Sequence, residues 1–180
     1  MRRYVFLLMT GLLSLTSMTA TGADTKTEAG VESAALRCSA ISLMHSTLTT
    51  PSPQFGEVMG EIAGLYAQVY AVQHEARTKQ KLNNAELRKR RDVILTEISK
   101  GWPKNKTAVV RDAALCNIWR IDFFSKLSEK PSEKEFQAAL ASLGPPPATV
   151  SKPEIDKWNG LTPQAVGIWA KIQLQTSQKK

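Results

Sequence analysis

Patterns that mark a catalytic or metal-binding site are missing from this sequence of 180 residues. It contains no Ser/His/Asp arrangement, no GxSxG, no phosphate-binding loop and no HExxH motif. Its two histidines and two cysteines form neither a CxxCH haem-attachment pattern nor pairs at the spacing of metal ligands. We therefore expect no catalytic residue, no metal and no cofactor, and the sequence leans away from an enzyme. Of the two histidines, we assign His45 to the core or its boundary, with a metal or haem ligand as the alternative, and His74 to the surface.

The sequence also lacks the alternation of apolar and polar residues that is typical of β-strands, and it has no internal repeat. Apolar residues recur three and four positions apart instead, which is the spacing of an α-helix with one buried side. The length is that of one domain. The predicted fold is therefore all-α, a bundle of four to six helices clamped by a disulfide.

Long apolar runs are absent apart from Tyr4–Leu15, which is shorter than the roughly 20 residues that a membrane-spanning helix needs. Arg2 and Arg3 precede this run, and the small residues Thr21-Gly22-Ala23 follow it as a cleavage site. These features predict an N-terminal signal peptide over residues 1–23, with a retained membrane anchor as the alternative. The mature protein is then expected in the periplasm or secreted, with no transmembrane segment.

Cysteine is scarce, and Cys38 and Cys116 are the only partners available to each other. In an oxidising compartment, a chain with an even number of cysteines forms disulfides by default. Closing so long a loop stabilises the folded state by roughly 4–5 kcal/mol in the chain-entropy account. We predict a Cys38–Cys116 disulfide, and two buried free thiols are the alternative.

Prolines and glycines divide the chain into a flexible leader at 24–30, a helical bundle at 31–143, and a segment at 144–180. This last segment begins with a proline-rich linker and ends in a helix that packs on the bundle. Helices are expected at Val31–Thr49, Gln54–Thr78, Ala85–Lys100, Thr107–Leu127, Pro131–Leu143 and Pro163–Gln175. Ser132 and Glu135 have the spacing of a capping box. The fourth helix is apolar almost all the way round, so we expect it to be the central rod of the bundle.

One charged residue, Arg120, lies on an otherwise apolar face of that fourth helix. Its burial would require a carboxylate or carbonyl partner. Glu57 and Glu61, one helical turn apart, are the candidates for a buried ion pair, and Asp92 is a further one. An anion-binding pocket is the alternative.

The second helix carries a stripe of small residues: Gly56, Gly60, Gly64, Ala67 and Ala71. Glycine weakens a helix by about 1 kcal/mol relative to alanine, so three glycines at a spacing of four indicate that a neighbour needs the space. We predict close packing against this stripe within the chain, and a dimer face is the alternative.

Positive charge is concentrated in the run Arg88-Lys89-Arg90-Arg91, within a chain of net charge +8. Such a run binds phosphates or an acidic partner, or else it is a solvated helix face. No aromatic residue interleaves with it, so it gives no strong signal for nucleic acid. The expected partner is another envelope protein or an anionic surface, and the chain is expected to be a monomer or a homodimer.

These observations together predict an exported, non-catalytic accessory or interaction protein that binds a partner through a basic helical face. A carrier of a small apolar ligand or cofactor between helices is the alternative. An exported enzyme without a recognisable motif is the third interpretation.

Overall fold

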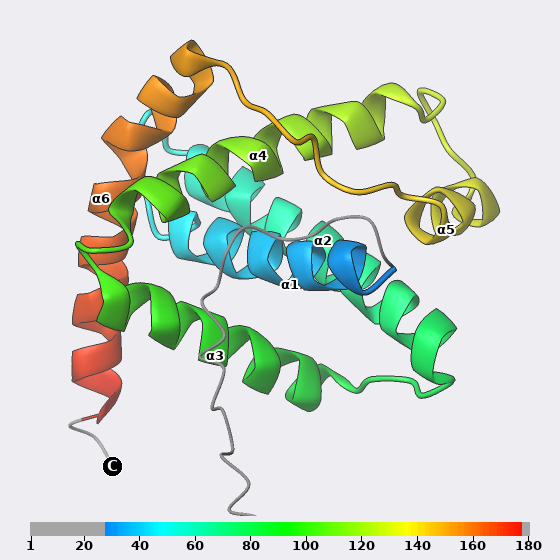
Figure 1. The fold of residues 1–180 in the computed structure, drawn as a ribbon, viewed down its shortest axis with the longest axis horizontal. Helices are drawn as coiled ribbons and strands as arrows, with labels where there is room; N and C mark the ends of the chain where they lie inside the picture. Colours follow the sequence, from blue (N-terminus) through cyan, green and yellow to red (C-terminus); the bar gives the residue numbers. More distant parts are fainter. Residues whose placement is uncertain (1–27, 178–180) are drawn as a thin grey trace, which may run out of the picture.

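The computed structural model describes residues 28–177, which form a bundle of six helices (Figure 1). In chain order they are α1 Glu28–His45, α2 Phe55–Thr78, α3 Asn84–Gly101, α4 Lys106–Ser125, α5 Glu133–Ala141 and α6 Lys152–Ser177. No β-strand occurs among these described residues, so the all-α prediction is confirmed. The predicted signal peptide and residues 24–27 of the predicted leader lie outside the described residues. Residues 28–30, also assigned to the leader, are the first residues of α1.

Helix α1 is the centre of the bundle, because α2, α3, α4 and α6 all contact it (Figure 1). Ala35, Ala40 and Met44 of α1 are fully buried, and these small or unbranched side chains let several neighbours pack closely. The prediction that the fourth helix is the central rod is wrong. On α4, Ile121 is 52% exposed and Phe124 is 47% exposed, so this helix keeps an outer side in contact with solvent.

Hydrogen bonds fix how α2 packs against its neighbours. The α1–α2 pair forms the largest contact between helices, and across it the Ser39 hydroxyl donates to the Ala63 carbonyl oxygen at 2.8 Å. Towards the C-terminal end of α2, Gln73 Nε2 donates to the carbonyl oxygens of Leu140 at 3.2 Å and Ala141 at 3.0 Å. Since these two carbonyls belong to the end of α5, Gln73 holds that short helix on the bundle.

A covalent and ionic clamp joins α4 to α1. The predicted disulfide between Cys38 and Cys116 is present. Arg37, next to Cys38 on α1, donates from Nε to Oδ2 of Asp112 at 2.6 Å. Asp112 lies one helical turn before Cys116 on α4. From α2, the Tyr66 hydroxyl donates to the Cys116 carbonyl oxygen. Together these contacts set the register of α4 along the two helices beneath it.

Two helix starts follow the rules of capping. The Asn83 side chain accepts a hydrogen bond from the Glu86 amide at 2.9 Å, so α3 begins one residue earlier than predicted. At α5, the Ser132 hydroxyl accepts from the Glu135 amide at 3.2 Å, which confirms the predicted cap. The Glu135 carboxylate does not close the capping box; it accepts from the amide and hydroxyl of Ser128.

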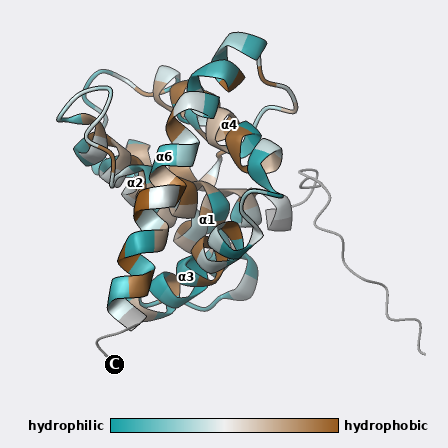
Figure 2. Ribbon diagram, turned by 90° about the vertical axis from the view of Figure 1, so that its left-hand side faces the viewer, coloured by the Kyte–Doolittle hydropathy of each residue, from teal (hydrophilic) through white to brown (hydrophobic). Residues whose placement is uncertain are grey.

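Helix α6 is longer than predicted, because it begins at Lys152 and runs through Pro163. Proline has no N–H to donate to the preceding turn and normally starts or interrupts a helix. The helix continues here because Trp158 and Val166, on either side of Pro163, are both buried against the bundle. Figure 2 shows hydrophobic and hydrophilic segments alternating along α6. Between residues 28 and 177, no helix has the length and hydrophobicity needed to cross a membrane.

Candidate interaction surface

The basic run on α3 is divided between the interior and the surface. Leu95 and Ile98 are buried and hold α3 on the bundle, so the helical phase of 100° per residue decides which basic residue faces out. Arg88 and Lys89 are exposed, whereas Arg90 is half-buried. Only part of the predicted binding run is therefore available to a partner.

Arg90 and Arg91 are both half-buried against neighbouring parts of the protein. Arg90 Nη1 donates to the Tyr70 hydroxyl at 2.7 Å, and Arg90 Nε donates to Glu86 Oε1 at 3.0 Å. These two hydrogen bonds raise the pKa of the Arg90 guanidinium. Arg91 is half-buried, its Nε is enclosed without an acceptor among the described residues, and burial lowers its pKa. Replacing either arginine would disturb the fold as well as the surface.

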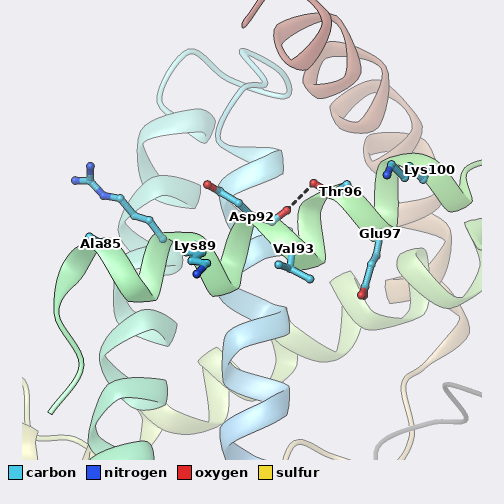
Figure 3. Close-up of a pocket in the computed structure, with 8 residues that line it drawn as sticks. Ala85, Lys89, Asp92, Val93, Thr96, Glu97 and Lys100 are labelled. Atoms are coloured by element: carbon cyan, nitrogen blue, oxygen red, sulfur yellow. Dashed lines mark hydrogen bonds between the residues drawn. The ribbon is translucent and has the colours of Figure 1, made fainter. Parts of the chain in front are cut away.

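The side of α3 opposite the core forms an open surface depression, here called the outer face. It is lined by Ala85, Arg88, Lys89, Asp92, Val93, Thr96, Glu97 and Lys100, all of them on this one helix (Figure 3). Val93 is 53% exposed at the middle of this face. None of the five charged residues of the outer face forms an ion pair with another described residue. The sequence indicated Arg88 and Lys89 for this face, but Val93, Glu97 and Lys100 were missed. Val93 and Glu97 follow Lys89 by four and eight residues, which places them on the same side of the helix.

The predicted ion pair between Arg120 and Glu57 or Glu61 is not formed among the described residues, and both glutamates are exposed on α2. Asp92, the further candidate, lies on the outer face of α3. Arg120 Nη2 instead donates to Asn117 Oδ1 at 3.2 Å.

Through Asn117, Arg120 belongs to a hydrogen-bonded network that reaches α6. Asn117 Nδ2 donates to Glu154 Oε1 at 2.7 Å, and Trp158 Nε1 donates to the same oxygen at 2.8 Å. The carboxylate in this network is Glu154 of α6, the helix against which α4 packs. The sequence could not indicate this network, because α6 was not expected to begin before Pro163.

A small void lies between α1, α2, α4 and α6. It measures about 10 Å³ and is lined by Ile41, Ser42, Met59, Ile62, Ala113, Cys116, Asn117, Arg120 and Trp158. A void of this size holds about one water molecule. The described helices therefore offer no support for a carrier of an apolar ligand at this junction.

The stripe of small residues on α2 meets another backbone at one end only. A Cβ atom on Gly56 would lie 2.6 Å from the carbonyl oxygens of Ser46 and Leu48, closer than side chains tolerate. Among the described residues, the atom nearest to a Cβ at Gly60 would be 3.9 Å away, and none lies within 4 Å at Gly64. The stripe's remaining members are Ala67, which is buried, and Ala71, which is half-buried. The prediction of close packing holds at Gly56 and is wrong at Gly64.

His74 is buried, which corrects its assignment to the surface. Its Nδ1 lies 2.7 Å from Glu32 Oε1, and Arg77 donates to both oxygens of the same carboxylate at 2.6 and 2.9 Å. Burial acts to raise the pKa of Glu32, but the hydrogen bonds and charges of Arg77 and His74 lower it overall. This group ties the N-terminal part of α1 to the C-terminal part of α2.

His45 is fully buried at the other end of α1, as predicted. Its Nδ1 lies 2.8 Å from the Ile41 carbonyl oxygen, which can only accept, so Nδ1 carries the proton. Nε2 then accepts from the Thr162 hydroxyl at 3.1 Å. Burial lowers the pKa of His45 to about 4. Both ring nitrogens are therefore engaged, and no group of three or more potential metal ligands occurs among residues 28–177.

Comparisons of the sequence with protein-family models and curated proteins, and of the fold with solved structures, gave no match for this chain. The candidate surface therefore rests on the residues of this chain alone.

Proposed function

We propose that the protein is an exported, non-catalytic accessory protein that binds an envelope protein through the outer face of α3. One observation carries the proposal: the outer face presents three cations and two carboxylates, a net charge of +1 (3 − 2), around the exposed Val93, and none of the five forms an ion pair with another described residue. The Cys38–Cys116 disulfide is compatible with an oxidising compartment outside the cytoplasm.

The physical basis of binding is a rigid display of charge. Leu95 and Ile98 fix α3 on the bundle, so the outer face loses little conformational entropy when a partner docks. Exposed charges attract a complementary surface over about 10 Å at moderate ionic strength, and salt weakens this attraction. Binding is therefore expected to be fast and dependent on salt.

A capture experiment from envelope extract tests the proposal. The variant is Arg88→Glu with Lys89→Glu, because both side chains are exposed and their reversal leaves Arg90 and Arg91 in place. The control is Lys130→Glu with Lys134→Glu, which changes the net charge equally at exposed positions near α5.

We expect both variants to unfold within about 1 kcal/mol of wild type, the scale of surface changes. Mass spectrometry should identify a protein recovered by wild type and control but lost with the α3 variant. Equal recovery of the same proteins by all three would show that the outer face is only a solvated surface.

A further inference from the structure

Two hydrogen-bonding groups beside the small void between α1, α2, α4 and α6 have no partner among residues 28–177. Arg120 lines this void, and its Nε is enclosed without an acceptor on a described residue. Ser42 lines the void as well; it is 1% exposed, and its hydroxyl bonds to none of the described residues. Buried polar groups are almost always hydrogen-bonded, either to the protein or to ordered water. Arg120 and Ser42 therefore mark a place where the fold takes a partner from outside the chain.

The disulfide brings these two side chains to the same void. Ser42 follows Cys38 by four residues on α1, and Arg120 follows Cys116 by four on α4, so each shares a side of its helix with the cysteine. The bond between the cysteines turns these two sides towards each other. A long side chain leans towards the N-terminus of its helix, and Arg120 accordingly reaches back to Asn117, whose Oδ1 accepts from Nη2 at 3.2 Å. The covalent clamp thus holds the polar groups of the site in place.

The polar groups at the void suit one small molecule that both accepts and donates. The Arg120 Nε can only donate, whereas the Ser42 hydroxyl can donate or accept. Asn117 also lines the void, and its Oδ1 has a second lone pair beside the one that Arg120 uses. The void measures about 10 Å³, enough for one water molecule, and a buried water typically forms about three hydrogen bonds.

We propose that this void binds one water molecule as a fixed part of the fold. The water accepts from Arg120 Nε, donates to Asn117 Oδ1 and forms its third hydrogen bond with the Ser42 hydroxyl. It links α1 to α4, and the hydrogen bond from Asn117 Nδ2 to Glu154 Oε1 at 2.7 Å carries the network on to α6. Arg120 thereby obtains the acceptor that its burial requires without an ion pair to Glu57 or Glu61.

A dry cavity and a bound anion both fit the site less well. Cavities that stay dry are lined by apolar groups, whereas this one is bordered by a guanidinium and a hydroxyl. A monatomic anion could accept from Arg120 and Ser42, but it would also face the lone pairs of Asn117 Oδ1. The Glu154 carboxylate already supplies negative charge to the same network. Water satisfies donors and acceptors together, which an anion cannot do.

The rest of the lining separates the site from bulk solvent. Ile41, Met59, Ile62, Ala113 and Trp158 complete it, and all five are buried. Exchange of the bound water therefore requires a local opening of the bundle, so the water should stay far longer than one on the surface. Since no residue of α3 lines the void, this inference goes beyond the proposed function and is independent of it.

A crystal structure of the mature, oxidised protein grown in sodium bromide tests the identity of the ligand. Data collected at the bromine absorption edge should show one density peak at about 2.7–3.2 Å from both Arg120 Nε and Ser42 Oγ, without an anomalous signal. An anomalous peak there would identify an anion and overturn the bound water. Featureless density in the void, or Arg120 Nε bonded directly to another part of the chain, would overturn it as well.

Oxygen-17 magnetic relaxation dispersion, which counts long-lived water molecules in solution, tests the ligand set. The variant is Ser42→Ala, and the matched control is Ser39→Ala. Ser39 lies three residues earlier on α1 and is equally buried, but its hydroxyl donates directly to the Ala63 carbonyl oxygen at 2.8 Å.

We expect Ser42→Ala to lose dispersion amplitude, because the water has one partner fewer and exchanges faster, while Ser39→Ala should match wild type. Equal amplitudes in all three proteins would overturn the assignment. An equal loss in both variants would show a general loosening of α1 and would also contradict it. Both variants should still capture the same envelope proteins as wild type, so the bound water and the proposed function can fail separately.

Discussion

Two glycines of the same helix, Gly56 and Gly64, should respond in opposite ways to substitution by alanine. Alanine is favoured over glycine within a helix by about 1 kcal/mol, so the intrinsic effect is stabilising at both positions. At Gly64 no atom of residues 28–177 lies within 4 Å of the added methyl group, and this stabilising effect should be seen undiminished. We expect Gly64→Ala to raise the free energy of unfolding by about 0.5–1 kcal/mol.

At Gly56 the added methyl group would lie 2.6 Å from two carbonyl oxygens, those of Ser46 and Leu48. Both oxygens belong to the backbone that joins α1 to α2, and Leu48 is buried, so the obstacle cannot be removed by rotating a side chain. The backbone must shift, and overpacking of this kind typically destabilises by about 1–3 kcal/mol. We therefore expect Gly56→Ala to be destabilising despite its helix propensity.

Urea denaturation followed by far-ultraviolet circular dichroism measures both effects, with wild type, Gly56→Ala, Gly60→Ala and Gly64→Ala compared under identical conditions. Gly60→Ala is the internal control, because its methyl group would meet only an ordinary contact at 3.9 Å with the Ser46 side chain. The expected order of stability is Gly64→Ala at or above Gly60→Ala, then wild type, then Gly56→Ala. Equal midpoints for Gly56→Ala and Gly64→Ala would refute the close approach at Gly56.

Four further predictions concern the clamp, two buried titratable groups and the N-terminus. Cys38→Ala with Cys116→Ala should lower the free energy of unfolding by roughly 4 kcal/mol in urea denaturation, since the bond closes a loop with a sequence separation of 78; an unchanged midpoint would contradict a stabilising clamp. Because the pKa of His45 is lowered from 6.5 to about 4, the unfolded chain binds a proton there before the folded chain does. Stability should therefore fall by up to roughly 3 kcal/mol as the pH drops from 6.5 to 4, and a His45→Gln variant should show a shallower fall. The pKa of Glu32 is lowered below 4.5, so the ionised carboxylate stabilises the folded state above that pH, and this stabilisation is lost as the pH falls below it. The thermal stabilities of wild type and Glu32→Gln should therefore converge under acidic conditions, and a constant difference would contradict this. N-terminal sequencing of the exported protein should begin at Asp24, and a chain that keeps residues 1–23 would indicate a membrane anchor.

Much of the helical architecture is readable from the chain alone, because it depends on local rules. Proline or glycine marks four of the five junctions between helices, and a polar turn at residues 79–83 marks the fifth. Ser132 caps α5 through a contact only three residues apart. The disulfide could be predicted without knowing the tertiary structure, because Cys38 had one possible partner. Helix α6 is the exception. A local rule placed its start at Pro163, but burial of Trp158 at a distant surface of the bundle maintains the helix on both sides of that proline.

Only part of the candidate surface could be predicted from the sequence. The run at residues 88–91 identified the right helix, but four consecutive residues span almost a full turn, and the docking of α3 on α1 determined which of them reach solvent. That docking turned Arg88 and Lys89 outward and Arg91 inward, and it left Val93 exposed at the centre of the outer face.

The sequence by itself determined the features that depend on a few neighbouring residues, namely the helical secondary structure and the helix caps. It also determined the pairing of the two cysteines, because there are only two. The tertiary structure alone decided which helix is central, which side chain Arg120 bonds to, and whether a glycine or a histidine has neighbours. The physical reason is that helix amphipathicity shows which side must be covered without showing what covers it. α4 is apolar on almost all sides, yet it is not the central helix. The smaller side chains of α1 allow four helices to surround α1 instead. For the same reason His74 reads as a surface residue until Glu32, 42 positions away, is brought against it.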